Sequence, residues 1–451
     1  MTAAPTRALH GWGRTAPSTA RVHRPESIAG VRELLTGAGP RGLIPRGLGR
    51  SYGDAAQNGG GDVVETAGLP ATVDVDAATA EATVGAGVSL RELITRALAA
   101  GFFVPVTPGT ADISVGGAIA ADVHGKNHHV DSSFGSAVRW IDLLTPDGEL
   151  RRLTPSDDLF WATVGGMGLT GIVTEARVAL LPVETDVIAA VEQAVPDLDA
   201  VLTGLTEADL RHPYTVAWID VTARGSGFGR GVLGMGRHAT RADVAAESRA
   251  AKLGWRGTAH RLTLPPVPGP GLINRYTVAA FNEAWFRRAG ARAEDKLTSI
   301  AAFFHPLDGV ASWNRVYGAT GLLQYQFVVP RSRDDALRHA LRAISAARMP
   351  SFLTVLKLFG PGNPGWLSFP MEGWTLAVDF PAAADGLPLL IADLDRIVAE
   401  AGGRIYLAKD SMTHPGTLGA MYPRLAQFRE LRSQIDADHR LVSDLSRRLA
   451  L

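Results

Sequence analysis

Residues 45–54 read Pro-Arg-Gly-Leu-Gly-Arg-Ser-Tyr-Gly-Asp, and the polar run Gln-Asn-Gly-Gly-Gly follows at 57–61. The glycines are spaced Gly-x-Gly-x-x-x-Gly, whereas a Rossmann nucleotide site has Gly-x-Gly-x-x-Gly and leads into a helix. Backbone N–H groups without neighbouring Cβ atoms can nevertheless wrap a pyrophosphate from a loop. The segment therefore indicates either a phosphate-binding loop of a non-Rossmann fold or an ordinary glycine-rich surface loop.

Two more glycine-rich segments lie within the first 175 residues. The first contains PGT at 108–110 and SVGGAIAADVHGKNHH at 114–129, where small residues let the backbone approach a flat ligand closely. The second, FWATVGGMGLTGI at 160–172, predicts a helix that ends in a glycine turn before a strand. Three such segments, each next to a strand, point to one shared ligand site.

The histidines at the end of the 114–129 segment leave two alternatives open. His124, His128 and His129, together with Asp122 or Asp131, have the residue types of a metal site but lack a helical frame. The second alternative to a polar end of the ligand site is a solvated loop. We expect no metal.

The composition sets limits on the fold and on the partners. The 451 residues favour two domains, or one large domain with an insertion. The net charge is zero, so no field of one sign would steer the protein to nucleic acid. The absence of cysteine excludes disulfides and thiolate catalysis. The sequence contains no signal-peptide core and no run of ~18 apolar residues. We expect a cytoplasmic protein, with a peripheral position at a membrane or the cell envelope left open.

The second half of the chain has a different pattern from the first. Alternating segments at 322–330, 351–360 and 373–381 predict strands, and amphipathic segments at 333–347 and 389–402 predict helices. The sequence therefore predicts an α+β protein whose second part is a largely antiparallel sheet flanked by helices. A single long helix is predicted over 424–448.

Lysine is rare in this chain, because arginine outnumbers it 40 to 5. Arginine serves wherever only charge is needed, whereas a buried lysine can also lose its proton. Three of the five lysines lie in segments that are candidates for catalysis or binding: Lys126, Lys357 and Lys409. Lys409 is expected at the end of a strand over Arg404–Ser411.

Taken in order, the motifs resemble a known family. PESIAGV, RGLGRSYGD, PGTADISVGGAIAADVHG, LLTPDGE and DLFWATVGGMGLTGI are similar to the FAD domain of the vanillyl-alcohol-oxidase (PCMH-type) flavoprotein superfamily. GWGRT at 11–15, HGKNHH at 124–129, FHPLD at 304–308, WNRVYG at 313–318 and LKLFGPGN at 356–363 resemble its decaprenylphosphoryl-ribose oxidase family. The resemblance extends from about residue 10 to the C-terminus, including RIYLAKDS at 404–411 and MYPR at 421–424.

The resemblance implies a PCMH-type FAD-binding domain over 1–185, completed by 404–451, and a substrate-binding domain over 186–403. Sugar-lactone oxidases of the superfamily link flavin to a histidine at the position that Arg50 occupies here, so non-covalent FAD is expected. A cysteine of some family members is Ala377 in this chain, so the chemistry needs no thiol there. The implied FAD-binding residues are Pro45, Arg46, Gly47, Leu48, Gly49, Arg50, Ser51, Tyr52, Gly53, Asp54, Ala55, Gly109, Ser114, Val115, Gly116, Gly117, Ala121, Asp122, Val123, His124, Ile172 and Tyr406.

The implied reaction is oxidation of the ribose 2'-hydroxyl of a polyprenyl-phospho-ribose to the 2'-keto sugar. A separate NAD(P)H-dependent keto-sugar reductase would complete epimerisation to the arabinose donor of cell-wall arabinan. Lys409 is the leading catalytic candidate, as base or flavin counter-charge, followed by Tyr52 and His124. The alternative is a sugar-alcohol or sugar-lactone oxidase of the same superfamily. The expected substrate residues are Lys126, Gln326, Lys357, Tyr325 and Trp218.

Overall fold

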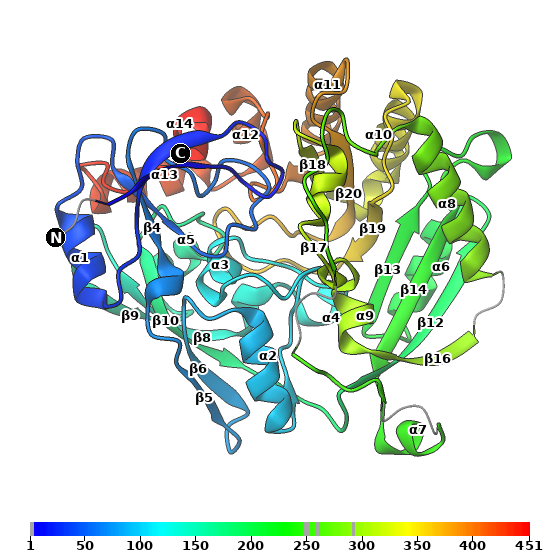
Figure 1. The fold of residues 1–451 in the computed structure, drawn as a ribbon, viewed down its shortest axis with the longest axis horizontal. Helices are drawn as coiled ribbons and strands as arrows, with labels where there is room; N and C mark the ends of the chain where they lie inside the picture. The colour runs from blue at the N-terminus through cyan, green and yellow to red at the C-terminus, as the bar shows by residue number, and fades with distance from the viewer. Residues whose placement is uncertain (1–3, 248–251, 258–261, 291–293) are drawn as a thin grey trace.

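The computed structural model describes residues 4–247, 252–257, 262–290 and 294–451. Figure 1 shows that the chain forms two parts side by side, the first built from blue to cyan segments and the second from green to orange ones. The red C-terminal helices return to the first part and lie beside the N-terminal strands. This α+β arrangement confirms the predicted fold class.

The first part contains two sheets and short helices. One sheet has the order β1 (Thr6–Leu9), β2 (Ser18–His23), β4 (Asp62–Glu65) and β3 (Leu43–Arg46). The other has the antiparallel order β5 (Val73–Asp76), β6 (Glu81–Gly85), β10 (Ile172–Ala179), β8 (Val138–Leu144) and β9 (Leu150–Leu153). A short pair joins β7 (Phe102–Phe103) to β11 (Leu181–Pro182). The helices are α1 (Ile28–Thr36), α2 (Leu90–Ala99), α3 (Val115–Ala120), α4 (His128–Asp131) and α5 (Asp158–Thr163).

Serine side chains fix where the helices of this part begin. The hydroxyls of Ser27, Ser89 and Ser114 accept hydrogen bonds from backbone N–H groups in the first turns of α1, α2 and α3. Such caps satisfy donors that a helix terminus leaves free. Helix α3 was not expected from the sequence, because a glycine-rich run is a poor helix signal. The β1–β2 hairpin was not expected either.

The second part is an eight-stranded antiparallel sheet. Its order is β16 (Glu294–Ser299), β12 (Val187–Val195), β14 (Gly231–His238), β13 (Tyr214–Ile219), β19 (Thr354–Phe359), β20 (Gly373–Pro381), β18 (Leu322–Pro330) and β21 (Arg404–Ile405). Helices α6 (Leu198–Asp209), α10 (Asp334–Ala347) and α11 (Leu387–Glu400) pack on this sheet. Shorter elements are α7 (Arg241–Ala245), α9 (Ile300–Phe304), β15 (Leu262–Thr263) and β17 (Val310–Ala311), and α8 (Arg275–Ala289) is a longer helix.

Two local predictions at the C-terminal end are wrong. The strand expected over Arg404–Ser411 ends at Ile405, and Lys409 lies in the turn that follows. The single helix expected over 424–448 is two helices, α13 (Leu425–Ile435) and α14 (Asp444–Leu449), preceded by α12 (Pro415–Met421). The chain leaves the helix because Leu43 N–H donates to the Arg440 carbonyl and Val442 N–H donates to the Leu43 carbonyl. Ser443 then caps α14.

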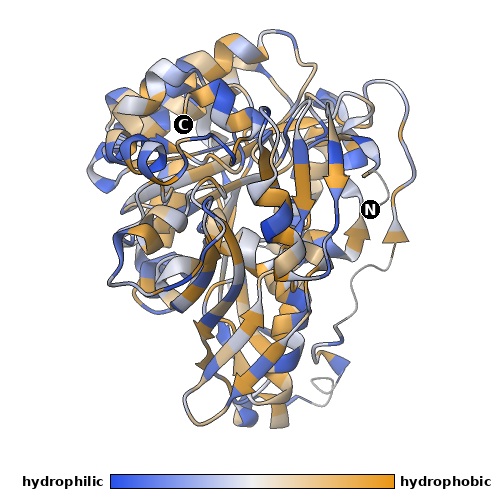
Figure 2. Cartoon of the chain, turned by 90° about the vertical axis from the view of Figure 1, so that its left-hand side faces the viewer, coloured by the Kyte–Doolittle hydropathy of each residue, from blue (hydrophilic) through white to orange (hydrophobic). Residues whose placement is uncertain are grey.

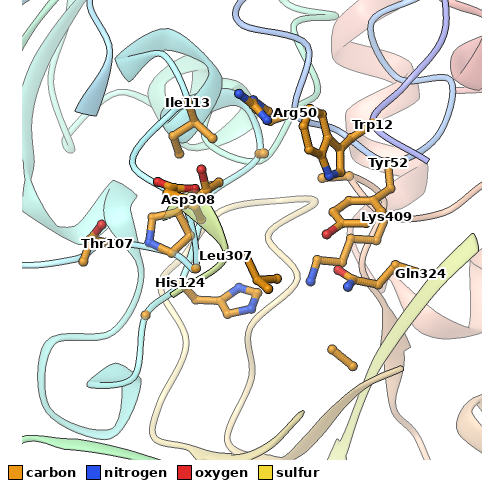
Figure 3. A pocket seen from close by; sticks show the side chains of 18 of the residues that line it. Trp12, Arg50, Tyr52, Thr107, Ile113, His124, Leu307, Asp308, Gln324 and Lys409 are labelled. Atoms are coloured by element: carbon orange, nitrogen blue, oxygen red, sulfur yellow. The ribbon is translucent and has the colours of Figure 1, made fainter. Parts of the chain in front are cut away.

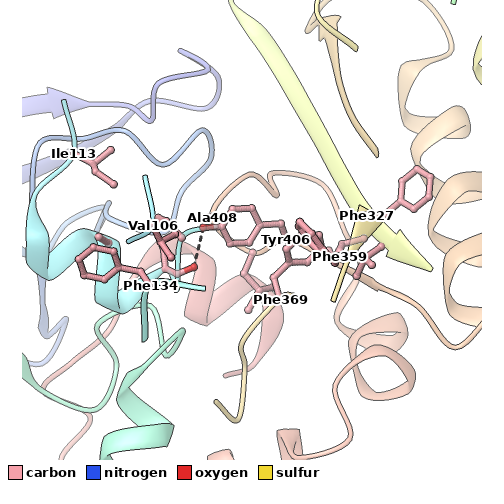
Figure 4. Close-up of a cluster of buried hydrophobic side chains, with 14 of the residues drawn as sticks. Val106, Ile113, Phe134, Phe327, Phe359, Phe369, Tyr406 and Ala408 are labelled. Carbon is pink, nitrogen blue, oxygen red and sulfur yellow. Dashed lines mark hydrogen bonds between the residues drawn. The ribbon is translucent and has the colours of Figure 1, made fainter. Parts of the chain in front are cut away.

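The core lies on both faces of the central strands of the large sheet, since nearly every residue of β18 and β20 is buried. Other strands, such as β2 and β13, alternate buried with less buried residues, and Figure 2 shows strands on which hydrophobic and hydrophilic positions alternate. Between the two parts, Tyr406 stacks on Phe369 at 4.8 Å between ring centres (Figure 4). Its hydroxyl donates to the carbonyl of Ala121, the residue that follows α3, at 2.8 Å. This contact ties the second part to the glycine-rich part.

Candidate functional site

A cavity of about 840 Å³ lies between the two parts of the molecule. Its walls are the three glycine-rich segments of the first part, together with the turn at 406–409. Its floor is one face of the eight-stranded sheet, and residues of α8 and α9 close one side. The volume falls within the range of about 300–1,000 Å³ that is usual for ligand sites.

The glycine-rich walls have the geometry of a cofactor cradle. A Cβ on Gly47 would lie 2.1 Å from Ser114 Oγ, so only glycine lets these two segments approach each other. Gly49 has a φ of +66°, a conformation that other residues rarely adopt. A Cβ on Gly109 would meet no atom within 4 Å, because that position faces the open cavity. Backbone therefore lines a space that a flat, extended ligand such as FAD can occupy.

Most of the predicted cofactor residues line this cavity. Arg50 Cζ lies 4.0 Å from the centre of the Trp12 ring, and the Arg50 side chain also pairs with Asp112. Figure 3 shows Arg50 and Trp12 side by side at the edge of the pocket. The predicted residues that line the cavity are Pro45, Gly47, Leu48, Gly49, Arg50, Ser51, Tyr52, Ala55, Gly109, Ser114, Gly116, Gly117, Ala121, Val123, His124, Ile172 and Tyr406.

Five predicted cofactor residues lie behind the wall. Arg46 donates to the carbonyls of His10 and Ala56, and Gly53 packs against the Asp410 carbonyl, which a Cβ would approach to 1.8 Å. Asp54 forms a bidentate ion pair with Arg448, and Val115 is buried in the core. These residues shape the loops that reach the cavity, but their side chains do not face it. The fifth such residue is Asp122.

Asp122 forms a buried polar cluster that joins the two parts of the molecule. Its carboxylate accepts from Ser133 Oγ at 2.7 Å, Gly135 N at 2.8 Å and Asn363 Nδ2 at 2.9 Å, and also from Ser368 Oγ. The carboxylate is thus fully used in structural hydrogen bonds. In the described part of the chain, no group of three or more His, Asp and Glu side chains could hold a metal ion.

The sheet floor presents alternate residues to the cavity. Gln326 on β18 and its cross-strand partner Ala377 on β20 both line it. Side chains of successive strand residues point to opposite faces, so Tyr325 and Gln326 cannot both face the ligand. The prediction that Tyr325 is a substrate residue is therefore wrong. Its hydroxyl donates to Asp395 Oδ1 of α11 at 2.7 Å, on the face covered by helices.

Lys409 lies at the cavity wall beside Tyr52. Its Nζ is 5.6 Å from the centre of the Tyr52 ring, and the Tyr52 N–H donates to the carbonyl of Ala408 at 2.8 Å. Enclosure by the protein lowers the pKa of Lys409 and raises that of Tyr52 well above its usual value. In Figure 3 the Lys409 amine extends next to Tyr52 and Gln324, facing His124 across the pocket.

His124 is held in the cavity wall as a neutral imidazole. Its Nε2 lies 2.9 Å from Gln326 Nε2, whose amide also donates to Thr375 Oγ1 at 3.0 Å. Burial, and then the positive charges of Lys357 and Lys409, lower the pKa of His124 well below its usual value. The Gln326 amide therefore fixes the orientation of the His124 ring through its Nε2 atom.

Lys126 and Lys357 project into the same part of the cavity. Lys126 Nζ donates to the Phe303 carbonyl at 2.6 Å, and Lys357 Nζ donates to the Gly125 carbonyl at 3.1 Å. Burial lowers the pKa of Lys126 to about 8. Burial, with the charges of Lys409 and Lys126, lowers the pKa of Lys357 to about 7. Trp218 also lines the cavity, with its indole N–H donating to the Phe352 carbonyl at 2.8 Å.

Several residues of the site were missed from the sequence. Gln324 lines the cavity two positions before Gln326, so strand alternation could have identified it. Trp12 reaches the pocket from an N-terminal loop, which no local pattern signals. His305 and Asp308 contact the first part: His305 Nε2 lies 2.8 Å from Thr107 Oγ1, and Asp308 accepts from Ala111 N at 2.9 Å.

Among the described residues, no helix combines the length and the apolar composition needed to span a lipid bilayer.

Comparisons with known proteins agree with this geometry. Residues 19–154 match the FAD binding domain family model. The chain is 43% identical to the decaprenylphosphoryl-β-D-ribose oxidase of Mycolicibacterium smegmatis, over 99% of this chain and 98% of that protein. It is 40% identical to an uncharacterized protein of Streptomyces coelicolor, over 81% of this chain and all of that protein. It is also 26% identical to an alditol oxidase of a Streptomyces species, over 98% and 99% of the two chains. The chain is therefore an FAD-dependent oxidoreductase that belongs to the decaprenylphosphoryl-β-D-ribose oxidase family.

Proposed function

We propose that this protein oxidises the ribose 2'-hydroxyl of decaprenylphosphoryl-β-D-ribose, or a close polyprenyl analogue, to the 2'-keto sugar. The observation that carries the proposal is a single cavity in which glycine-rich loops face a sheet floor bearing lysine and amide groups. A relative that is 43% identical over nearly the whole chain carries the name of this activity.

The loops around Gly47, Gly109 and Gly117 would hold FAD, which supplies the hydride acceptor when bound. We propose that the cofactor is held without a covalent bond, because Arg50 occupies the position of the linking histidine and is already engaged with Trp12 and Asp112. The support for a completed cofactor domain over 1–185 and 404–451 comes from the contacts of α14 and residues 440–442 with the first loop.

We propose that three side chains of the wall handle the proton of the substrate hydroxyl. Lys409 either takes this proton or holds a positive charge beside the cofactor. His124 is neutral and its Nε2 is fixed by Gln326, so it is oriented for a hydrogen bond to the sugar. Tyr52 packs against Lys409 and contributes a hydroxyl that enclosure keeps protonated.

Lys126 and Lys357 are suited to the phosphodiester of such a substrate. Both ammonium groups lie in the cavity and each donates to a backbone carbonyl, which leaves further N–H bonds for an anion. A phosphodiester is anionic throughout the working pH range, whereas a free sugar or alditol offers no charge to this pair. The lysine pair therefore favours the phospho-sugar over the alditol alternative.

The polyprenyl chain would leave the cavity beneath α8. Phe281 and Trp285 of this helix line the cavity opposite Val216, Val232 and Trp218 of the sheet. Three large hydrophobic residues of this region are exposed: Tyr276 in α8, Leu272 just before it, and Leu262 in β15. This arrangement supports a peripheral position at a membrane that contains the lipid substrate.

We infer that a separate NAD(P)H-dependent reductase reduces the ketone to complete the epimerisation. The inference rests on the membership of this chain in the decaprenylphosphoryl-β-D-ribose oxidase family, for which the resemblance implies such a partner.

Anaerobic reduction of the protein-bound flavin tests the function. Polyprenylphosphoryl-β-D-ribose should bleach the flavin absorbance, whereas the arabinose epimer, xylitol and a sugar lactone should not do so at comparable concentration. Rapid bleaching by xylitol alone would establish the alditol oxidase alternative, and no bleaching by any of them would overturn the enzymatic assignment of the cavity.

A further inference from the structure

Asp379 is a buried carboxylate beside the Lys409 end of the cavity. On the sheet it is the cross-strand partner of Gln324, and Gln324 Nε2 donates a hydrogen bond to its Oδ1. Asp379 is 0% exposed, and among the described residues its Oδ2 has no hydrogen-bond partner. A carboxylate in such a position is costly to bury unless a positive charge lies close to it.

The contact with Asp379 fixes the orientation of the Gln324 side chain. Because the amide nitrogen donates to the carboxylate, the amide oxygen is left as an acceptor, and it is buried without a partner among the described residues. In Figure 3 the two donors next to Gln324 are the amine of Lys409 and the hydroxyl of Tyr52. Gln324 therefore lies between the carboxylate and the amine.

The other groups around Lys409 offer it no negative charge at neutral pH. Tyr52 comes from the first glycine loop and Tyr317 from the segment before β18, and burial raises the pKa of both hydroxyls well above the usual value. His124 is neutral, and Lys357 on β19 repels a second cation. Burial raises the pKa of Asp379 and lowers that of Lys409, and the opposite charges of the two groups counteract both effects, so each group favours the charged form of the other.

Lys357 provides an internal comparison for Lys409. Both amines open to the same cavity, but the groups that act on Lys357 are burial and the positive charges of Lys409 and Lys126. Within the described residues, no carboxylate therefore acts on the charge of Lys357, whereas Lys409 has Asp379 behind Gln324.

We propose that Asp379 is a positioning residue for Lys409: through its charge, and through the orientation it imposes on Gln324, it keeps the Lys409 amine protonated. The proposal deepens the proposed function, since it assigns the Lys409 group the ammonium form in the resting enzyme. The charge state itself can be measured without any substrate.

The scarcity of lysine makes a direct measurement practical. The chain has five lysines, so FAD-loaded protein labelled with ¹³Cε-lysine gives five ε-methylene signals, and a Lys409→Met variant assigns the one of interest. In the unaltered protein the Lys409 signal should titrate at a higher pH than that of Lys357. In Asp379→Asn, which keeps the volume and the acceptor for Gln324, the midpoint of Lys409 should fall by about one pH unit or more.

Asp395→Asn is the matched control. Asp395 is a second buried carboxylate, which lies on α11 and accepts a hydrogen bond from Tyr325. Tyr325 is on the face of β18 opposite to Gln324, so the loss of the Asp395 charge should leave the Lys409 midpoint unchanged. An unchanged midpoint in Asp379→Asn, or an equal fall in both variants, would refute the proposal. If Asp379→Asn does not retain FAD, the proposal can still be tested by the titration midpoints of Lys409 and Lys357 in the unaltered protein. A Lys409 midpoint at a lower pH than that of Lys357 would refute the proposal.

A kinetic measurement links the charge to the reaction. The rate of anaerobic flavin reduction by the polyprenylphosphoryl ribose should fall in Asp379→Asn at pH 7 and recover as the pH is lowered, because Lys409 regains its proton. A merely structural role would lower the rate equally at all pH values, and that result would contradict the proposal. If the unaltered protein shows no reduction at all, the proposed function fails while the titration result stands.

Discussion

The guanidinium of Arg50 lies 4.0 Å from the centre of the Trp12 ring, and its Nη2 is 3.4 Å from a carboxylate oxygen of Asp112. The Trp12 ring covers the face of the guanidinium, and Asp112 contacts its edge. An arginine held in this way has no nucleophilic nitrogen to offer a cofactor, since the group keeps its proton at all working pH values.

The purified protein should therefore be yellow and should release its FAD when denatured. Acid precipitation, followed by an absorbance spectrum of the supernatant, measures the release. Flavin that remains with the precipitated chain would show a covalent link and contradict the prediction.

Gly109→Val should abolish FAD retention and leave the fold intact. The added side chain enters the open cavity and meets no protein atom, so only the cofactor is displaced. Gly419→Val is the control, because that glycine is also unhindered but lies on the exposed side of α12, away from the cavity. Flavin content and circular dichroism are the measurements. A fully flavin-loaded Gly109→Val protein would mean that the cofactor lies elsewhere.

Lys409→Ala should slow hydride transfer by roughly 10²-fold, the usual effect of removing a positioned acid or base group. Lys409→Arg should also fail, because the planar guanidinium fork does not match the geometry of a single ammonium contact. Stopped-flow reduction of the bound flavin under anaerobic conditions measures both rates. Near-normal reduction by the arginine variant would show that any positive charge suffices at this position, and Tyr52 and His124 would become the candidates for proton transfer.

Substitutions of Tyr325 and Gln326, which are neighbours on β18, should affect different properties: stability for Tyr325 and KM for Gln326. Tyr325→Phe should lower stability by about 1–3 kcal/mol, because it leaves the buried carboxylate of Asp395 without its donor, but should leave KM unchanged. Gln326→Leu should raise KM, because it removes the group that orients His124. Chemical denaturation and steady-state kinetics separate the two effects. A raised KM in Tyr325→Phe would contradict the placement of that residue on the covered face.

The KM for the phospho-sugar should rise with pH between 6 and 9. The pKa of Lys357 is lowered to about 7 and that of Lys126 to about 8, so both cations are present at pH 6 and are lost as the pH increases. The phosphodiester keeps its charge over this range, so the loss of attraction comes from the protein. Lys357→Met should start from a higher KM and show a weaker pH dependence. A KM that does not change with pH would exclude these lysines from phosphate binding.

The sequence was informative where local pattern decides the structure. Strand alternation predicted β18, β19 and β20, and the glycine segments predicted the wall of the cavity. It failed where partners distant in sequence decide. Leu43 interrupts the C-terminal helix by pairing with residues 440–442, and Asp122 turns from the cavity because Asn363 and Ser368 bind its carboxylate. The Tyr325 assignment failed differently, since alternation alone forbids it to share a face with Gln326.

The last residues of the chain support the first cofactor loop: Arg448 holds Asp54, and residues 440–442 extend the pairing of Leu43. Asp54 and Arg448 are 394 residues apart in the sequence, so the loop is synthesised long before the residues that support it. Stable binding of FAD is therefore expected only after residues 440–448 have folded against the loop. Loss of a few C-terminal residues would consequently yield a protein that keeps its substrate sheet but lacks the yellow colour of a flavoprotein.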